Sequence, residues 1–353
     1  MRISLTNSQR TFSATADQSL LDAALAAGLN LPHSCKSGNC GSCRARLSRG
    51  TIRYPHGCPL GLSEAEVADG YILMCQARAA SDLELAPTEI SAASEATIKR
   101  LPCRIERALP LSHDVMALYL RLPAVEAFHF EAGQYIDIML SGGRRRSFSI
   151  ASPPHDSKLL ELHVRRVAGG ELTERLFNEQ TRNALLNIEG PLGQFVYRPT
   201  APRLNGASAA PILMIGGGTG LAPLKSILRH VIETGIDRPM TLYWGVRSER
   251  DLYAHAELER VALQAPRFRY VPVLSEPQST WAGRRGWVHA APLHDIGALD
   301  PYDIYASGPP AMIAAVRSEF AAHGADASRL FFDSFDYAPD TLERQRMSAV
   351  TKS

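Results

Sequence analysis

The sequence lacks long hydrophobic runs and carries almost no net charge. Its longest apolar stretches, such as PILMI at 211–215, are far shorter than the roughly 20 residues that a membrane-spanning helix needs. The 38 Lys and Arg residues nearly balance the 36 Asp and Glu residues, which argues against a strongly basic nucleic-acid-binding protein and against an acidic tail. We therefore expect neither a membrane span nor a nucleic-acid partner.

Other absences narrow the class of protein further. The opening residues, MRISLTNSQR, lack the apolar core of a secretion signal, so we expect a cytoplasmic protein. The 11 histidines show no metal-ligand spacing, and no acid–base pair or nucleophile stands out. The 353 residues, 45% of them apolar, suffice for two to three folded domains at roughly 150 residues per domain. The six cysteines are therefore the most informative residues.

Three of the cysteines lie close together. The segment CKSGNCGSC at 35–43 has the spacing C-x4-C-x2-C, which with one remote cysteine is the plant-type [2Fe–2S] pattern. Thiolates suit the soft iron–sulfur core, and four of them complete two tetrahedral irons. We predict that Cys35, Cys40 and Cys43 bind a [2Fe–2S] cluster. A structural zinc site is the alternative, but such sites usually contain two short C-x-x-C pairs, and this run contains one.

Two cysteines compete for the fourth position in the cluster. Cys58 lies in HGCPLG, an irregular loop, whereas Cys75 lies in YILMCQA, an apolar strand-like run. A remote strand that folds back to close the cluster fits the plant-type pattern. We therefore predict Cys75 as the fourth ligand and regard Cys58 and Cys103 as bystanders.

The residues around the cysteines predict a small α+β domain. RISLT at 2–6 and TFSAT at 11–15 alternate as in a hairpin, and DQSLLDAALAAG at 17–28 is typical of a short helix that Gly28 ends. This arrangement resembles the β-grasp ferredoxin domain, which we place at 1–90. The domain has eight basic and eight acidic residues, whereas diffusible plant ferredoxins are acidic. A neutral domain favours tethering to an electron donor in the same chain.

A second domain follows a small, polar linker at 87–100. Short strand-like runs with turn signals between them predict an antiparallel barrel at 98–200. The expected strands are ALYLRL (117–122), QYIDIML (134–140), RSFSIAS (146–152), LLELHVRRV (159–167) and LLNIEG (185–190).

One of these strands carries a signature. The tetrapeptide RSFS at 146–149 resembles the flavin motif R-x-[YF]-S of the ferredoxin–NADP reductase superfamily. The resemblance implies FAD on the barrel, with Arg146 at its pyrophosphate, Phe148 stacked on its ring and the Ser149 hydroxyl near N5, the atom that accepts hydride. The alternative is a surface strand with a solvated arginine cluster at 144–146.

A second segment of the barrel matches the same superfamily. HVRRVAGGELTERLF at 163–177 contains a strand, a Gly-Gly turn and a helix, and a helix N-terminus is a ready site for anions. In the superfamily this segment holds the FAD phosphates. In the two segments together, the expected FAD-binding residues are Arg146, Ser147, Phe148, Ser149, His163, Val164, Arg165, Gly169, Gly170, Glu171 and Thr173.

The third domain begins after a Pro- and Ala-rich boundary at 199–210. The segment 211–235 indicates a strand, a glycine loop and a helix. The loop lacks the third glycine of G-x-G-x-x-G, so the regular dinucleotide fingerprint fails. GGGTGLAP instead resembles the nucleotide loop of the same superfamily, which implies a parallel-sheet α/β domain for NAD(P)H at 208–340. The residues expected at the pyrophosphate are Gly217, Gly218, Thr219 and Gly220.

The choice between NADH and NADPH stays open in the sequence. After the strand TLYWGV, Arg247 and Arg250 suit the 2′-phosphate of NADPH, while Glu249 or Asp251 suits the free 2′-hydroxyl of NADH. A solvated loop of mixed charge is the alternative. We lean towards NADH and count Arg247 among the cofactor-binding residues.

Two further segments resemble the parts of the superfamily that meet at the flavin. DIYASGPPAMI corresponds to the last nucleotide element, but Ser307 stands before Gly308 where the family usually has cysteine. FFDSF at 331–335 corresponds to the closing strand, which implies that Asp333 and Phe335 lie near the flavin. The residues expected closest to the reacting atoms are Ser149, Ser307 and Phe335.

The order of the three domains resembles the reductase components of ring-hydroxylating dioxygenases and multicomponent monooxygenases. The stretch STWAGRRGWVHAAPLHDI at 279–296 is similar to the CDP-6-deoxy-glucoseen reductase group. The resemblance implies an oxidoreductase that passes electrons from NAD(P)H through FAD to a [2Fe–2S] cluster and on to an oxygenase or a deoxysugar dehydratase. A flavin reductase acting directly on a small molecule and a redox-sensing iron–sulfur module are the alternatives.

Overall fold

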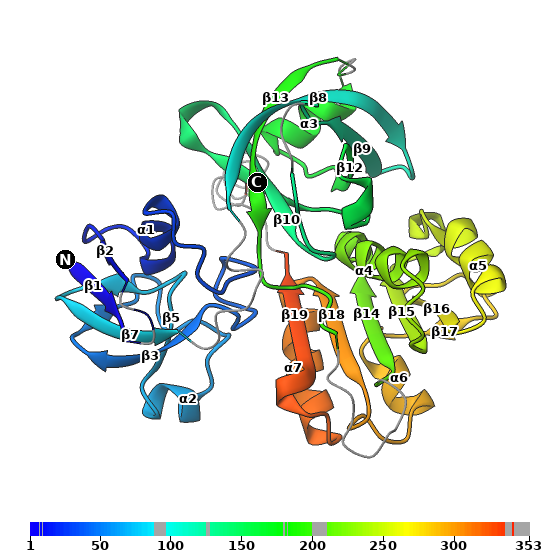
Figure 1. Cartoon of the computed structure of the whole chain (residues 1–353). Helices are drawn as coiled ribbons and strands as arrows, with labels where there is room; N and C mark the ends of the chain where they lie inside the picture. Colours follow the sequence, from blue (N-terminus) through cyan, green and yellow to red (C-terminus); the bar gives the residue numbers. More distant parts are fainter. Residues whose placement is uncertain are drawn as a thin grey trace, which may run out of the picture.

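The chain folds into three domains that follow one another in the sequence. The computed structural model describes residues 1–6, 8, 10–87, 97–124, 128–178, 181, 183–199, 210–335 and 341. A β-grasp sheet, an antiparallel barrel and a parallel α/β sheet form the three units (Figure 1). This confirms the predicted fold class. Much of both expected linkers lies outside the described residues.

The first sheet has the strand order β2-β1-β7-β3-β5, with β1 and β7 parallel. Helix α1 (Leu20–Ala26) begins after Ser19, whose hydroxyl accepts the amide of Asp22, and its buried leucines cover the sheet. The remaining elements are β1 (Arg2–Leu5), β2 (Thr11–Ser13), β3 (Arg44–Arg49), β4 (Ile52–Arg53), α2 (Glu64–Ala68), β5 (Tyr71–Leu73), β6 (Arg78–Ala79) and β7 (Leu83–Pro87).

The second sheet curls into a barrel with the order β11-β10-β13-β8-β9-β12. A bridge between Ile150 and Leu162 joins its two edges. The 12-residue strand β8 was not among the predicted strands, because KRLPCRIERALP contains charges and two prolines that disfavour a central strand. The elements are β8 (Lys99–Pro110), β9 (Val115–Arg121), β10 (Tyr135–Met139), β11 (Arg145–Ser149), β12 (Leu159–Arg165), α3 (Glu171–Asn178) and β13 (Leu185–Leu192).

The third sheet is entirely parallel, with the order β17-β16-β15-β14-β18-β19. The direction of the strand order reverses between β14 and β18, the position at which such sheets bind ligands. The elements are β14 (Ile212–Gly217), α4 (Leu221–Glu233), β15 (Met240–Val246), α5 (His255–Gln264), β16 (Phe268–Leu274), β17 (Arg284–Arg285), α6 (Ala290–Asp295), β18 (Asp303–Gly308), α7 (Pro310–Ala322) and β19 (Leu330–Ser334).

Helix α4 is buried on two sides. Its predicted apolar face packs on the sheet, and its other side lies against the barrel. There the Ser226 hydroxyl donates to the Ser152 carbonyl at 2.8 Å, and the Lys225 ammonium donates to Glu161 at 3.0 Å and to Glu257 at 3.0 Å. These polar contacts fix the barrel on the third domain.

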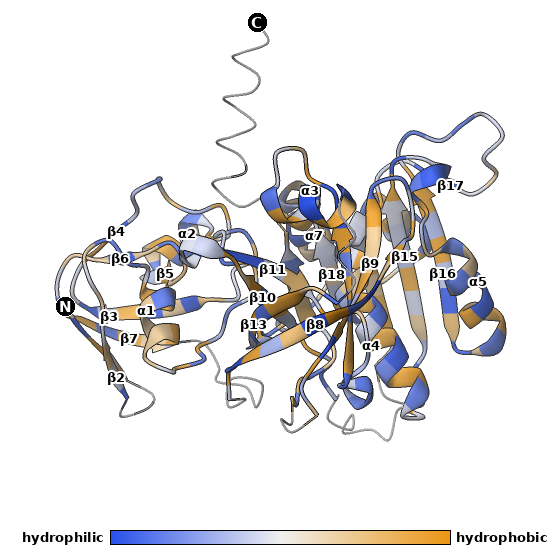
Figure 2. Cartoon of the chain, turned by 90° about the horizontal axis from the view of Figure 1, so that it is seen from above, coloured by the Kyte–Doolittle hydropathy of each residue, from blue (hydrophilic) through white to orange (hydrophobic). Residues whose placement is uncertain are grey.

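The distribution of hydropathy on helix α5 fits its position against the third sheet. Seen from above in Figure 2, α5 carries both polar and apolar residues along its length, as a helix with one face on a sheet does. Within the described part of the chain, no helix is both long enough and apolar enough to cross a membrane.

A buried ion pair anchors the start of the third sheet. Arg238 is 2% exposed; its guanidinium donates to the Ala210 carbonyl at 2.7 Å and contacts the carboxylate of Asp303. Arg329 approaches the same carboxylate at 2.8 Å. Because a buried carboxylate needs partners to offset its lost hydration, these arginines stabilise β18.

We expect Arg238→Met to lower the free energy of unfolding of the third domain by about 3 kcal/mol, because it removes one partner of a buried charge. Arg267→Met, which removes a solvent-exposed pair with Asp237, should cost less than about 1 kcal/mol. Tryptophan fluorescence during urea unfolding measures this domain specifically, because all three tryptophans lie in it. Equal losses in the two variants would contradict the assignment.

Candidate functional site

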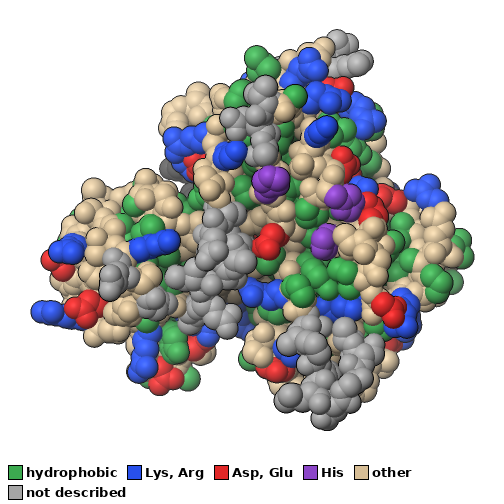
Figure 3. Space-filling model, viewed as in Figure 1, with side chains coloured by type: hydrophobic (Ala, Val, Ile, Leu, Met, Phe, Trp, Pro, Cys, Tyr) green, Lys and Arg blue, Asp and Glu red, His purple; other side chains and the backbone are tan. Residues whose placement is uncertain are grey.

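A cavity of about 1980 Å³ lies where the three domains meet. Single-ligand pockets usually measure about 300–1,000 Å³, so this one has room for more than one cofactor. Its wall includes residues 34–37, the end of β11, the glycine loop after β14 and the residues after β19. On the face drawn in Figure 3, histidine side chains gather where the barrel meets the third domain.

The segment 34–43, called the cluster loop below, curls back on itself. Gly38 and Gly41 have positive φ angles of 82° and 78°, which favour glycine. The Cys40 N–H donates to the Cys35 sulfur at 3.3 Å, and the Cys35 N–H donates to the Cys40 sulfur at 3.5 Å. Contact with the Cys40 thiol lowers the pKa of Cys35. The loop thus presents sulfurs and N–H groups on its inner side.

The structure separates the two candidates for the fourth ligand. The Cys75 thiol contacts the Cys43 thiol, which raises the pKa of Cys75, and the Gln76 amide lies 3.9 Å from the Cys75 sulfur. The four predicted ligands therefore form two contacting pairs, Cys35 with Cys40 and Cys43 with Cys75. This donor set fits a [2Fe–2S] cluster. Cys58 is exposed.

Strand β11 brings the predicted flavin tetrapeptide to the cavity. Arg146, Ser147, Phe148 and Ser149 all line its wall, and Phe148 also packs on the barrel core. The neighbouring Tyr135 hydroxyl is buried without a partner among the described residues. Since buried hydroxyl groups normally have partners, this orphan fits a wall that a polar cofactor covers.

A carboxyl group connects this strand to the cluster loop. Asp333 of β19 accepts hydrogen bonds from the Ser149 hydroxyl, at 3.4 Å, and from the Ser34 hydroxyl. Asp333 is 3% exposed, and burial raises its pKa to about 7. One side chain of the third domain therefore contacts both a predicted flavin residue and the residue that precedes Cys35.

The turn before α3 also faces the cavity, as expected for the FAD phosphates. Gly169 has a φ of 76°, and a Cβ at Gly170 would lie 2.6 Å from the Thr173 hydroxyl. That hydroxyl accepts the Val167 N–H at 3.2 Å and closes the turn. Gly170 and Thr173 line the cavity, whereas Glu171 pairs with Arg144 at 2.6 Å.

The three candidates on β12 occupy different surroundings. The ring nitrogens of His163 contact Glu161 and the Tyr253 hydroxyl, both at 3.0 Å, which leaves neither nitrogen for a cofactor. Burial lowers the pKa of His163. Val164 points into the barrel core. Arg165 lines the cavity, and its guanidinium lies beside the glycine loop.

The glycine loop lies at the point where the strand order of the third sheet reverses. Gly217, Gly218 and Thr219 line the cavity. Trp244 donates its indole N–H to the Gly218 carbonyl at 2.9 Å. A Cβ at Gly220 would lie 2.1 Å from the Ser307 carbonyl oxygen, so β18 approaches as closely as glycine permits. One side of the loop is therefore open to the cavity, where a phosphate group can bind, and its other side packs closely against β18.

Ser307, Gly308 and Phe335 differ in their access to this cavity. Ser307 is fully buried, and its hydroxyl has no partner among the described residues. The Gly308 carbonyl accepts the Phe335 N–H at 3.0 Å. Of the three, only Phe335 contributes to the wall. Ser307 therefore lies beneath the cavity wall and does not form part of it.

The four candidates for recognition of the adenosine ribose, which are two carboxylates and two arginines, make different contacts. The Glu249 carboxylate accepts the Gln278 N–H at 3.2 Å, and Asp251 accepts the N–H and the hydroxyl of Ser248, both at 2.9 Å. Arg247 and Arg250 are exposed and line the cavity. Asp251 also lines the cavity, whereas Glu249 does not, so one carboxylate and two arginines remain at the wall as candidates for the ribose.

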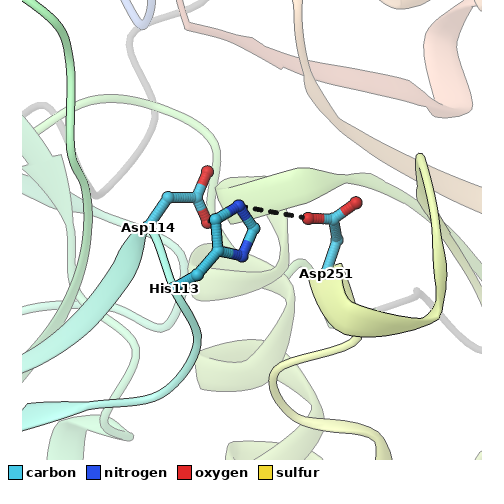
Figure 4. A group of neighbouring side chains, drawn as sticks. All are labelled: His113, Asp114 and Asp251. Carbon is cyan, nitrogen blue, oxygen red and sulfur yellow. Dashed lines mark ion pairs between the residues drawn. The ribbon is translucent and has the colours of Figure 1, made fainter.

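His113, Asp114 and Asp251 form a compact group between the barrel and the third domain (Figure 4). The histidine Nε2 lies 3.8 Å from Asp251 and 3.9 Å from Asp114. Arg165 approaches Asp114 at 3.2 Å, and Asp251 holds Ser248. Because both carboxylates already have partners, we interpret the group as a contact between domains.

Comparison with known proteins assigns all three domains. Residues 3–80 match the 2Fe-2S iron-sulfur cluster binding domain, 102–197 the oxidoreductase FAD-binding domain and 214–318 the oxidoreductase NAD-binding domain. The CDP-6-deoxy-L-threo-D-glycero-4-hexulose-3-dehydrase reductase of Yersinia pestis is 38% identical over 324 residues, which is 92% of this chain and 95% of that protein. The chain belongs to the iron–sulfur flavoprotein reductases. The reductase is thus an NAD(P)H-dependent oxidoreductase with FAD and a [2Fe–2S] cluster, which confirms the predicted cofactors.

Other relatives cover nearly the whole reductase. Reductase component 2 of terephthalate 1,2-dioxygenase from Comamonas is 33% identical and covers 96% of this chain and 98% of its own. The crystal structure of the Amycolatopsis cytochrome P450 reductase has a TM-score of 0.76 at 33% identity, with 95% of this chain and 99% of that chain covered. Electron transfer from NAD(P)H is therefore the shared activity.

Sequence reasoning missed several polar residues at this site. Asp137 of β10 is 1% exposed and binds Lys36 of the cluster loop at 3.0 Å and the Ser147 hydroxyl at 2.5 Å. An acidic residue within the apolar run QYIDIML was a signal for such a buried pair, because a buried charge needs a partner. Tyr135 and Ser34 carried no comparable signal.

We expect Cys75→Ser to lose the visible absorption and the iron of the cluster, because it replaces one of the four thiolates that a [2Fe–2S] core requires. Cys58→Ser is the matched control and should keep both. Iron analysis and the visible spectrum of the two purified variants give the measurement. A cluster that survives in Cys75→Ser but is lost in Cys58→Ser would reverse the assignment.

Proposed function

We propose that this reductase delivers electrons singly to a separate acceptor protein, and that those predicted residues that line the cavity or belong to the cysteine pairs bind its cofactors. The observation that carries the proposal is the meeting of three elements at one cavity. The cluster loop, strand β11 and the glycine loop come from three different domains, and each contributes to its wall. FAD bound there would supply the chemistry that divides the two electrons of a hydride from NAD(P)H into single electrons for the cluster.

In this proposal the third domain orients the nucleotide. The open glycine loop offers backbone N–H groups to the pyrophosphate, as helix N-termini do for anions. Arg165 of the barrel lies beside the loop and adds a fixed positive charge. Phe335 lies at the wall beyond β19, where it would cover the flavin ring. Ser307, which is buried, supports the loop from behind through its backbone.

The barrel orients the flavin and controls a proton. Phe148 and Tyr135 line the wall, where Phe148 would stack on the flavin and the buried Tyr135 hydroxyl, which has no partner among the described residues, would be available as a hydrogen-bond partner. The Ser149 hydroxyl, which Asp333 holds, would form a hydrogen bond with the flavin near N5. A carboxyl with a pKa of about 7 exchanges protons at neutral pH, so Asp333 is able to hold the proton that accompanies electron transfer.

The acceptor is a deoxysugar dehydratase or an oxygenase component. Support for the first comes from the name and 38% identity of the Yersinia pestis relative, and for the second from the Comamonas dioxygenase reductase at 33%. We also propose that the protein works in the cytoplasm. The two cysteines outside the predicted cluster, Cys58 and Cys103, form no disulfide, which is the usual state of thiols in a reducing compartment.

Anaerobic mixing with NADH tests the electron path. We expect NADH to bleach the flavin and then the cluster of the wild-type protein and to support reduction of cytochrome c. In Cys40→Ser the flavin should still bleach, but cytochrome c reduction should fall at least about tenfold because the cluster cannot relay single electrons. A flavin that neither NADH nor NADPH bleaches would refute the proposal. Unchanged turnover in Cys40→Ser would favour direct reduction of a small molecule at the flavin.

The same assay tests the preference for NADH, which stays a prediction. We expect kcat/KM to be higher for NADH than for NADPH. Because the guanidinium groups of Arg247 and Arg250 line the cavity, Arg247→Ala should reduce kcat/KM for NADPH more than for NADH. A higher kcat/KM for NADPH in the wild-type protein would overturn the preference and would assign the 2′-phosphate to these arginines.

A further inference from the structure

Arg317 of α7 connects the third domain directly to the cluster loop. Its Nη1 donates to the Gly61 carbonyl at 2.9 Å, and its Nη2 donates to the carbonyls of Asn39, at 3.2 Å, and of Cys40. Figure 1 shows α7 and β19 as the part of the third domain nearest to the β-grasp domain. One side chain therefore holds the backbone on which a predicted cluster ligand sits.

The surroundings of Arg317 are shaped for a guanidinium. Its central carbon lies 5.1 Å from the centre of the Phe332 ring. A Cβ at Gly41 would lie 3.1 Å from Nη2, so the glycine of the C-x4-C-x2-C run leaves room for the arginine. A planar group with several donors stacks on a ring and reaches three carbonyls at once, whereas a lysine ammonium is a single point of charge.

The charge of Arg317 has no carboxylate partner among the described residues. The acidic side chain near it, Glu66, pairs with Arg44. A half-buried cation needs compensation, and the adjoining group of opposite charge is the thiolate set of the cluster loop. A [2Fe–2S] core with four thiolates is anionic and gains a further negative charge on reduction. A fixed cation beside it favours the reduced form.

Two other contacts hold the same loop from different sides. Ser34 donates to Asp333 of the third domain, and Lys36 pairs with Asp137 of the barrel at 3.0 Å. With Arg317, they hold the cluster loop at residues 34, 36 and 39–40. The cluster loop is thus fixed in both position and orientation relative to strand β11.

We propose that Arg317 is a positioning residue for electron transfer from the flavin to the cluster. It holds the cluster loop beside the flavin-binding strand, and its charge raises the reduction potential of the cluster. This inference rests on the proposed function, in which the cluster takes electrons from the flavin.

The test compares Arg317→Gln, Arg317→Lys and the control Arg53→Gln in the cofactor-loaded full chain. Arg53 is also a cation of the β-grasp domain, but it bonds Ala16 and Asp17 on that domain's own surface. Two quantities are measured: the cluster potential, by dithionite titration followed by electron paramagnetic resonance, and the rates of flavin and cluster reduction after mixing with NADH.

In Arg317→Gln we expect the equilibrium between the reduced and oxidised cluster to shift about tenfold towards the oxidised form, which is about 59 mV for a one-electron couple. Cluster reduction should also slow at least about tenfold, while hydride transfer to the flavin stays unchanged. Arg317→Lys keeps the positive charge and should therefore keep the cluster potential close to that of the wild-type protein. It should still slow electron transfer to the cluster, because an ammonium lacks the planar set of donors that reaches three carbonyls at once. Arg53→Gln should resemble the wild-type protein.

A wild-type potential and a wild-type rate of cluster reduction in Arg317→Gln would overturn the proposal. If Arg317→Gln binds no cluster, Arg317→Lys decides: slower cluster reduction supports the positioning role, and a wild-type rate overturns it. The cluster potential is measured without NAD(P)H, so this measurement tests the role of Arg317 independently of the proposed electron path from the nucleotide. If neither nucleotide bleaches the wild-type flavin, the proposed function fails, whatever the titration gives.

Discussion

The docking of the cluster loop onto the seam between the barrel and the third domain is the interaction on which the rest of the site depends. Electron transfer between two cofactors requires a fixed short separation, and the cofactor-binding elements here come from three domains. The loop is held by Asp333, Asp137 and Arg317, which lie on different strands and a helix. Charged and polar groups make this contact, so its geometry is directional, unlike that of an apolar interface.

A second contact, between α4 and the barrel, holds the barrel and the third domain together. Lys225 of α4 is 7% exposed and lies between Glu161 of the barrel and Glu257 of the third domain. Burial alone would raise the pKa of Glu161, but hydrogen bonds and charge from His163 and Lys225 lower it to about 2. The carboxylate therefore stays ionised across the physiological range, and the barrel cannot shift on the third domain without breaking this pair.

The parallel topology of the third sheet explains why so much chemistry gathers at one edge. The ends of β14, β18 and β19 lie side by side, with Gly216 opposite Ser307 and Ser307 opposite Asp333. Three segments that are about 90 and 25 residues apart in the chain thereby bring the glycine loop, the buried Ser307 and the Asp333 carboxyl group to one place. The closeness of Gly220 to Ser307 shows how little space separates them.

The sequence by itself determined the cofactors, the order of the domains and the cysteine spacing, because each of these is written in residues that are close along the chain. C-x4-C-x2-C, RSFS and GGGTGLAP act through local backbone shape and side-chain chemistry. Cys75 stays a prediction: its strand-like run forms β5 only as far as Leu73, and Cys75 lies in the turn that follows, in contact with Cys43. The prediction failed for β8, whose prolines and charges are tolerated because tertiary pairing with β9 and β13 outweighs local propensity.

Only the tertiary structure decided that His163 has both nitrogens occupied, that Ser307 is buried, and that Ser34 meets Asp333 across 299 positions of the chain. Such contacts leave no local pattern, because the packing of separate domains, rather than neighbouring residues, brings the two groups together.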